Sequence, residues 1–321
     1  MAILWAGTSL ADAALAGGTL TTDSGQIATT VSEGIACTNT QTCLSPHVAP
    51  KDEFWFLDTY HWAAATLPNA NSLNLAFCDT SGIPVLRMRL ASTGGVHQIE
   101  KWTGSAWTML AQTPVGFTGR NRLDLHVKMA TSGWVRLYVS GALLLNFEGD
   151  TSAGTNRINQ VILGSGQGSA SYVCRHSGFV LADEDTRPFI FYQRLPTGNG
   201  AETSWTGDYT AVDETGVNDA DFISSTSPND LETFTFNALP GAFDNNRLRG
   251  VVLSGRTNGS GSPGNIRGVA RVGGVNYDIP GETDTTPTYG PQQWIFETNP
   301  ATGQPWLGSE VNSSQFGVKS I

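Results

Sequence analysis

Apolar and polar residues alternate most regularly between residues 122 and 150. Three segments of this stretch place apolar side chains at every second position, which is the period of a β-strand with one buried face. Residues 131–133 and 140–141 separate the segments, and their glycines can take the positive φ that tight hairpins need. The pattern predicts a three-stranded antiparallel meander. Its core positions are Leu123, Leu125, Val127, Val135, Leu137, Val139, Leu143, Leu145 and Phe147.

Polar and amphipathic residues fill the intervening positions of the same three segments. An antiparallel sheet with one face on a core and the other toward water has this composition. We therefore expect one side of the meander to be the solvent face. The residues on this side are Asp124, His126, Lys128, Trp134, Arg136, Tyr138, Asn146 and Glu148.

Shorter segments of the same kind occur on both sides of the meander. Residues 1–50 predict a first strand with long surface connections, and in 84–91 the apolar Leu86, Met88 and Leu90 alternate with Arg87 and Arg89. About a dozen strands without a helix are typical of a two-sheet sandwich. The further predicted strands are 54–66, 72–78, 96–102, 107–110, 158–164, 171–175 and 179–182.

Charge and proline interrupt the apolar pattern at residues 183–188. We place a domain boundary here, which gives domains of residues 1–186 and 187–321. The high content of glycine (37 residues) and proline (15 residues) and a charged fraction of only 14% fit short strands and turns in both. The second domain is predicted to be a smaller β-sandwich. Its candidate strands are 189–194, 231–236, 247–255, 265–272, 275–279 and 292–297.

The distribution of charged and apolar residues argues against nucleic acid and a membrane as partners. A formal net charge of −10 without clustered Lys or Arg argues against nucleic acid, whose binding draws on such clusters. The first cationic residue is Lys51, so the N-terminal segment is a poor secretory signal. No apolar run approaches the roughly 20 residues that cross a bilayer. We expect a soluble protein without a membrane partner.

The four cysteines, Cys37, Cys43, Cys78 and Cys174, have no C-x-x-C spacing, so a zinc site is not expected. Buried free thiols are the favoured interpretation of all four. Whether Cys37 and Cys43 close a small loop as a disulfide stays open.

The order of features from NRLDLHVKM through SGWVRLYVSGALLLNFEGD and INQVILGSG to SYVCRHSGFVLADED resembles the concanavalin A-like jelly roll of the laminin G type. In that family a strand with a central Trp and a "YV-x-G" hairpin precede an "I-x-x-V-x-L-G" strand and a closing strand that ends in acidic residues. The resemblance covers about residues 1–186 and implies a jelly-roll sandwich. Together with the second domain, it predicts an all-β fold.

The sequence lacks the catalytic and metal-binding motifs that proteins with this jelly roll can carry. Glucanases on the same jelly roll carry an E-x-D-x-x-E run, which this chain lacks, and no histidine accompanies a G-x-S-x-G motif. Asp79, Asp150 and Asp183 are loop candidates for calcium, but without a second ligand a structural role is favoured. We predict that the chain is not an enzyme and has no catalytic residue, metal or cofactor.

The C-terminal segment resembles the ends of tailed-bacteriophage virion proteins, in which an "N-P-x-T-G-x-P-W" turn precedes a "V-N-x-x-x-F-G-V" strand. This resemblance implies a structural component of a phage particle, made in the host cytoplasm and located in the virion. Its implied partners are other virion proteins and further copies of itself in a homo-oligomer, for which a trimer is the guess. The matching residues are Asn299, Pro300, Thr302, Gly303, Pro305, Trp306, Val311, Asn312, Phe316, Gly317 and Val318.

Exposed aromatic residues point to a glycan, because sugar rings stack on flat aromatic side chains while polar neighbours take the hydroxyls. Trp102 and Trp107 flank one hairpin, and Trp134 and Tyr138 share the polar side of the meander. We predict that these four contact a host surface polysaccharide. The alternative is that Trp134 and Tyr138 cover a second sheet or a subunit interface. A free lectin, or a depolymerase whose carboxylates converge from separate strands, is the alternative function.

Overall fold

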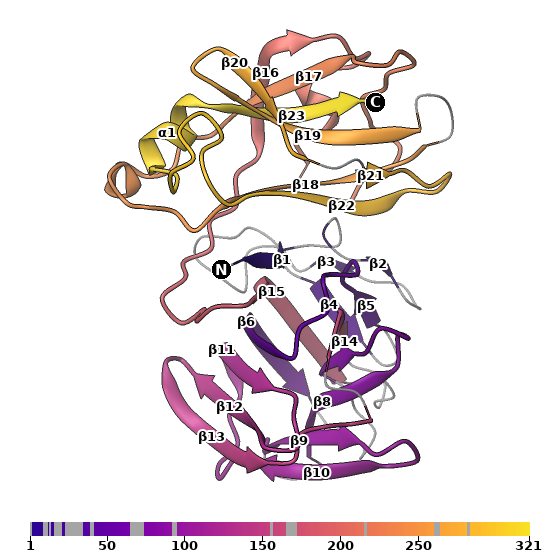
Figure 1. Cartoon of the computed structure of the whole chain (residues 1–321), viewed down its shortest axis with the longest axis vertical. Coiled ribbons are helices and arrows are strands. Elements are labelled where there is room, and N and C mark those ends of the chain that lie inside the picture. The colour runs from indigo at the N-terminus through magenta and orange to yellow at the C-terminus, as the bar shows by residue number, and fades with distance from the viewer. Residues whose placement is uncertain are drawn as a thin grey trace. The chain divides into compact units, whose positions relative to one another are not determined.

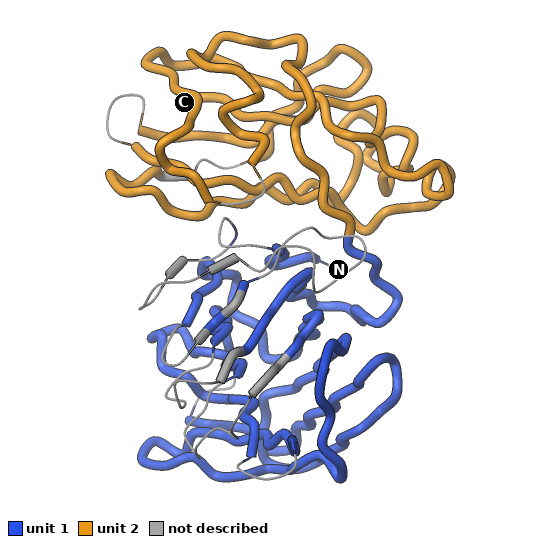
Figure 2. Tube along the Cα trace, turned by 180° about the vertical axis from the view of Figure 1, so that it is seen from behind, with its two compact units in different colours: residues 1–191 blue, residues 192–321 orange. Residues whose placement is uncertain are grey.

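The structure is a computed structural model of the chain. It forms two units, Met1–Phe191 and Tyr192–Ile321 (Figures 1 and 2). No helix among the described residues is long and apolar enough to span a membrane. The described residues are 2–8, 12, 14–15, 21–22, 35–38, 42–64, 74–91, 95–154, 157–164, 172–214, 217–259, 264–280 and 283–321.

Unit 1 is a sandwich of two antiparallel sheets, as predicted (Figure 1). The first sheet, sheet A, has the order β13-β12-β11-β6-β15-β4-β3, and β1 also pairs with β15. Its strands are β1 (Ile3–Gly7), β3 (Thr21–Thr22), β4 (Ile35–Thr38), β6 (Glu53–Ala64), β11 (Gly119–Lys128), β12 (Gly133–Val139), β13 (Ala142–Gly149) and β15 (Tyr172–Ala182).

The second sheet, sheet B, has the order β10-β9-β8-β7-β14-β5-β2. Consecutive strands β7 to β10 form a second meander, because short turns connect antiparallel neighbours. Its strands are β2 (Ala14–Leu15), β5 (Thr42–Leu44), β7 (Leu75–Cys78), β8 (Pro84–Leu90), β9 (His97–Trp102), β10 (Trp107–Gln112) and β14 (Gln160–Gly164).

The predicted meander of residues 122–150 is confirmed as β11, β12 and β13. The prediction of a core position is wrong for Leu143, which is 52% exposed, because the register of β12 and β13 shifts between Leu137 and Tyr138 and places Leu143 opposite Tyr138. Leu125 pairs with Leu137, and Leu137 with Leu145, so the other apolar positions of the three strands fall on one face. That face is buried between the sheets, where Phe54 of sheet A lies 4.7 Å from Phe77 of sheet B between ring centroids. Each fully buried aromatic side chain of this kind stabilises the fold by roughly 1.5–3 kcal/mol.

Strand β15 replaces the two short strands that the sequence predicts at 171–175 and 179–182. It runs without a break from Tyr172 to Ala182, with a register shift against β6 between Ser177 and Val180. Gly178 lies in this shift with φ +56°, a conformation that glycine adopts without a Cβ clash. Glycine here therefore marks a bulge inside one strand. Residue 171 lies outside the described residues.

An ion pair is buried in the interior of sheet A. His176 Nδ1 lies 2.7 Å from Asp58 Oδ2, and both side chains are excluded from solvent. Burial lowers the pKa of His176, but the charge of Asp58 and the hydrogen bond to it outweigh burial and raise the pKa to about 10. The imidazole is therefore charged at neutral pH.

All four cysteines are free and buried. Burial raises the pKa of Cys37, and it raises the pKa of Cys43 and of Cys78 to about 12. Cys37 on β4 and Cys43 on β5 belong to different sheets and are not joined. Such protonated thiols are poor nucleophiles.

Unit 2 has its own core around Trp294, Trp306 and Phe316. One sheet has the order β16-β17-β23-β19-β20, with β21 paired to β19, and a second sheet consists of β18 and β22. Its elements are β16 (Pro196–Thr203), β17 (Leu231–Phe236), β18 (Val251–Thr257), β19 (Asn265–Val272), β20 (Val275–Asp278), β21 (Thr283–Asp284), β22 (Gly290–Phe296), α1 (Gly308–Ser313), β23 (Gln315–Ser320) and two short 3₁₀ turns, η2 (Tyr209–Ala211) and η3 (Gly241–Phe243).

The boundary region differs from the sequence prediction. Residues 187–191, which we assigned to the second domain, belong to unit 1, and the predicted strand at 189–194 does not form. Phe189 is buried, and its carbonyl oxygen accepts a hydrogen bond from Arg122. Phe189 therefore docks on unit 1, whereas its neighbour Ile190 is 68% exposed, and neither residue starts a new strand.

The C-terminal turn at residues 299–306 is closed by local hydrogen bonds. Asn299 and Gln304 form a β-bridge, and Gly303 between them has φ +68°. Trp306 is fully buried and donates its indole N–H to Phe296 O at 3.0 Å. The conspicuous Trp of this motif thus anchors the turn to the core of unit 2.

Candidate functional site

Four ring side chains gather on the side of sheet A that faces away from the core. Trp55 on β6, His126 on β11, and Trp134 and Tyr138 on β12 form this group, which we name the ring cluster. Trp55 stacks on His126 at 4.2 Å between centroids, and Tyr138 lies 5.9 Å from Trp55. Trp134 meets His126 edge-on at 5.7 Å. Cross-strand pairing explains the stack of Trp55 on His126, because these two residues are directly opposite each other. Trp134 is paired with Lys128 and reaches His126 as a diagonal neighbour.

His126 is the titratable member of the ring cluster. Burial lowers the pKa of His126 and outweighs Glu53, which raises it. Its Nε2 lies 3.0 Å from Glu53 Oε1 and 3.4 Å from Trp134 Nε1. A neutral imidazole serves only one of these contacts at a time, because Nε2 either donates to the carboxylate or accepts from the indole. The proton position on His126 is therefore coupled to the orientation of Trp134.

Cations cover the rings of the cluster. Lys128 Nζ and Arg136 Cζ lie 4.9 and 5.1 Å from the Trp134 ring centroid, within cation–π range. The carboxylates that pair with them, Glu53 at 3.7 Å and Glu148 at 3.3 Å, are exposed. Exposed pairs of this kind contribute little, about 0–1 kcal/mol, so both cations are available to a ligand.

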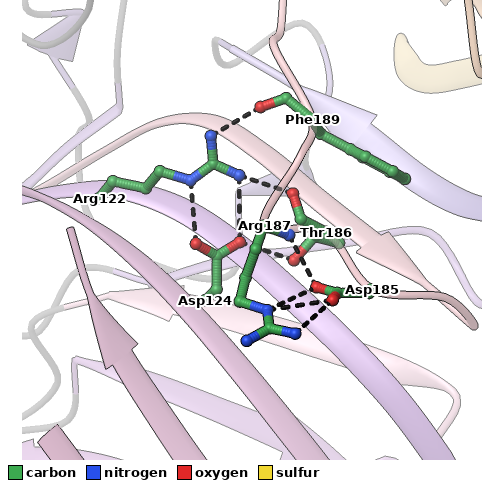
Figure 3. A network of polar contacts seen from close by, with 6 residues as sticks. All are labelled: Arg122, Asp124, Asp185, Thr186, Arg187 and Phe189. Atoms are coloured by element: carbon green, nitrogen blue, oxygen red, sulfur yellow. Dashed lines mark hydrogen bonds and ion pairs between the residues drawn. The ribbon is translucent and has the colours of Figure 1, made fainter. Parts of the chain in front are cut away.

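Residues 183–191 cross this face of sheet A, and we name them the strap (Figure 3). Arg122 donates to Thr186 O and to Phe189 O, both at 2.6 Å, and Thr186 Oγ1 donates to the buried Asp124 at 2.7 Å. These bonds fix the strap over β11.

The strap also places a cation over two rings of the cluster. Asp185 holds Arg187 through two parallel hydrogen bonds of 2.9 and 2.6 Å (Figure 3). The Arg187 guanidinium lies 4.6 Å from the Tyr138 ring and 5.2 Å from the Trp55 ring. Trp55 is consequently covered, and Trp134 and Tyr138 are the half-exposed rings of the cluster.

A shallow hollow opens beside Trp134, where β12 and β13 meet the turn that precedes β12. It offers an aromatic edge, a guanidinium, a carboxylate, hydroxyls and glycine backbone within one concave surface. Groups of this kind match the hydroxyls and the apolar face of a sugar. The lining residues are Thr131, Ser132, Gly133, Trp134, Arg136, Glu148 and Gly149.

The structure separates the four predicted glycan contacts into two pairs. Trp134 and Tyr138 lie on sheet A, whereas Trp102 and Trp107 face each other on β9 and β10 of sheet B, 5.4 Å apart. Arg87 lies 4.2 Å from the Trp107 ring. Contact of these residues with a glycan stays a prediction.

Trp55 was missed as a site residue because it lies in the dense aromatic run at 54–56. Parity identifies it: Phe54 and Phe56 point into the core, so Trp55 between them points away.

The predicted calcium candidates are engaged in hydrogen bonds within the chain, Asp79 and Asp150 in local turns and Asp183 with the distant Ala2. Asp79, Asp150 and Asp183 each accept at least one backbone N–H hydrogen bond. Within the described ranges, no group of three or more His, Cys, Asp or Glu side chains is placed to hold a metal ion.

Comparisons with known proteins concern the fold. No protein-family model and no curated protein matches the sequence. Among solved structures, the chain is similar to cellulose induced protein Cip1 (TM-score 0.43, 12% identity, 55% of this chain and 93% of that chain). It is also similar to an endo-β-1,4-glucuronan lyase from the fungus Trichoderma reesei (0.42, 11%, 57% and 96%) and to the carbohydrate-binding module CBM66 from Bacillus subtilis (0.37, 9%, 55% and 96%).

At such low TM-scores and identities, these likenesses assign no activity to this chain. One prediction is nevertheless corrected. We expected that the chain is not an enzyme, and the presence of a polysaccharide lyase among the similar structures contradicts that exclusion. The missing E-x-D-x-x-E run excludes one way of cleaving a polysaccharide and leaves others open.

Proposed function

We propose that unit 1 binds a polysaccharide on the polar face of sheet A, with Trp134 as the central contact. The observation that carries this proposal is the hollow beside Trp134, which combines a half-exposed indole with Arg136 and Glu148. A sugar ring packs its C–H face on the exposed part of the Trp134 ring, and its hydroxyls bond to the two charged side chains. The strap limits the site to the β12–β13 side, because it covers β11 beside Trp55.

A panel of immobilised neutral and acidic polysaccharides, probed with the full chain, identifies the ligand. Arg136→Gln and Glu148→Gln should each weaken retention of the chain, because each removes charged partners of sugar hydroxyls. Arg267→Gln in unit 2 is a matched control that also removes an arginine from a surface ion pair. Retention of the two sheet A variants equal to that of the control would refute the proposed site.

Cleavage of the bound polysaccharide is a second candidate function, and His126 favours it. Its imidazole is kept neutral by burial and contacts Glu53, so it can accept a proton near neutral pH. We expect degradation to be lost in His126→Gln with the fold retained, as followed by the release of new chain ends and by circular dichroism. Degradation at the wild-type rate by the variant would remove His126 from this role.

The virion role is a separate proposal, and its support is the sequence of residues 299–318. A structural component of a phage particle would carry a glycan-binding unit 1 in a symmetric homo-oligomer, with a trimer as the first expectation. Light scattering of the purified chain tests this. A symmetric assembly supports the proposal, and a monomer that binds polysaccharide favours a free lectin or depolymerase.

A further inference from the structure

Sheet B carries a charge cluster on the side that faces away from the core. Arg87 and Arg89 on β8 both bind Glu100 on β9. Arg87 Nε donates to Glu100 Oε2 at 2.6 Å, and Arg89 Nε donates to Oε1 at 2.8 Å. Each carboxylate oxygen of Glu100 thus accepts a hydrogen bond from one guanidinium.

The cluster carries one positive charge more than its carboxylate neutralises. The three side chains are largely withdrawn from water, with 12%, 14% and 7% of Arg87, Arg89 and Glu100 exposed. Desolvation lowers the pKa of Arg87, because burial makes the charged form of the guanidinium less favourable in free energy. The remaining side chains directly opposite the cluster, Ala76 on β7, Gln98 on β9 and Met109 on β10, are uncharged. An excess cation in such surroundings is stabilised by an anion.

Arg89 has unused donors to offer that anion. A guanidinium has five N–H groups, and Arg89 uses only its Nε–H within the part of the chain that the structure describes. Its two terminal nitrogens present the planar fork that binds a carboxylate through two parallel hydrogen bonds.

Apolar surface adjoins the cluster. Arg87 stacks on Trp107 at 4.2 Å, and Trp107 in turn contacts Trp102. Met109, directly opposite Glu100, is 51% exposed. A ligand that is anionic at one edge and apolar on one face meets both parts of this surface.

We propose that Arg87, Arg89, Trp107 and Met109 form a second binding site, which takes the carboxylate of an acidic sugar. The carboxylate binds the free edge of Arg89, and the C–H face of the same sugar packs on Trp107 and Met109. The site lies on sheet B and does not use the ring cluster of sheet A. Because Arg89 binds a carboxylate, the site makes unit 1 selective for polysaccharides that contain uronic acid residues.

Calorimetric titration of the full chain with a uronic acid oligosaccharide, with its neutral counterpart and with inorganic sulfate tests this site. We expect binding of the uronic acid oligosaccharide that weakens with salt, and no binding of the neutral one at this site. Arg89→Gln should weaken binding of the acidic oligosaccharide about tenfold or more, because a charge-assisted contact is lost. It leaves Arg87 paired with Glu100, so the fold is retained.

Lys101→Gln is the matched control, because Lys101 is a neighbouring cation that is already paired with Asp150. It should change binding little. An effect of Arg89→Gln no larger than that of Lys101→Gln, or sulfate binding as tight as that of the acidic oligosaccharide, would overturn the sheet B site. Loss of binding only in Arg136→Gln would overturn it as well and leave the proposed sheet A function standing.

Discussion

Replacement of Asp58 by asparagine tests the buried ion pair that supports sheet A beneath the ring cluster. Asp58→Asn conserves the size of the side chain and removes its charge. Asp58 contributes most to the rise in the pKa of His176, with a smaller contribution from Cys174, and is the carboxylate that pairs with the imidazole inside the sandwich. Without Asp58 the imidazole must lose its proton or remain as an unpaired buried charge.

The expected loss follows from the pKa. One pKa unit corresponds to about 1.4 kcal/mol, so the rise from 6.5 to about 10 in the fold corresponds to about 5 kcal/mol. Removal of one partner of a buried ion pair typically costs about 3–5 kcal/mol. We therefore expect Asp58→Asn to lower the free energy of unfolding of unit 1 by about 3–5 kcal/mol at about pH 6.

The pH dependence has a defined sign. Because the pKa of His176 is higher in the folded than in the unfolded chain, the ion pair stabilises fully below about pH 6.5. Its contribution is lost as the pH rises through about 10. The difference in unfolding free energy between wild type and Asp58→Asn should therefore shrink between these two values.

Urea denaturation followed by tryptophan fluorescence measures this difference across the pH range. Asp52→Asn is the control, since Asp52 is exposed on the same unit. A destabilisation no larger than that of the control, or a difference that stays constant up to about pH 10, would refute the role of the pair.

Three further predictions concern other parts of the chain. Arg122→Met should lower the free energy of unfolding by about 3 kcal/mol, because it leaves the buried Asp124 without its cation; an unchanged denaturation midpoint would contradict this. Gly268→Ala should cost about 1–3 kcal/mol in unit 2, because the new Cβ would lie 2.4 Å from Trp294 Cγ; calorimetric unfolding measures it, and a wild-type transition would count against the packing. Cys43, with its pKa raised to about 12 by burial, should react with a thiol reagent only in denaturant, and mass spectrometry of labelled native chain showing modified Cys43 would argue against its burial.

Strict period-two alternation made the meander of unit 1 predictable. Leu125, Leu137 and Leu145 share a parity and pair directly, because only one register buries all three. Strand β16, PTGNGAET, was not predictable in this way, since it has almost no apolar residue and forms through pairing with β17. Helix α1 was missed because six residues are too few for a helical period to show.

The candidate site was predictable only in part. Trp134 and Tyr138 were placed on a polar face by parity, which the register confirms. The cation over the Tyr138 ring was not predicted, because Arg187 lies in the strap, 49 positions beyond Tyr138 in the sequence. The docking of the strap depends on Arg122, whose bonds to distant carbonyl groups leave no pattern in the sequence.

The affinity of wild type and Trp134→Ala for the polysaccharide that the panel identifies tests the central claim most directly. Both proteins are titrated as full chains, with Arg267→Gln in unit 2 as the control, since Arg267 belongs to neither proposed site. We expect Trp134→Ala to bind at least about tenfold more weakly than wild type with the same thermal unfolding, as expected for a central aromatic contact. Binding of Trp134→Ala with wild-type affinity, or a wild-type chain that binds no member of the panel, would contradict the account.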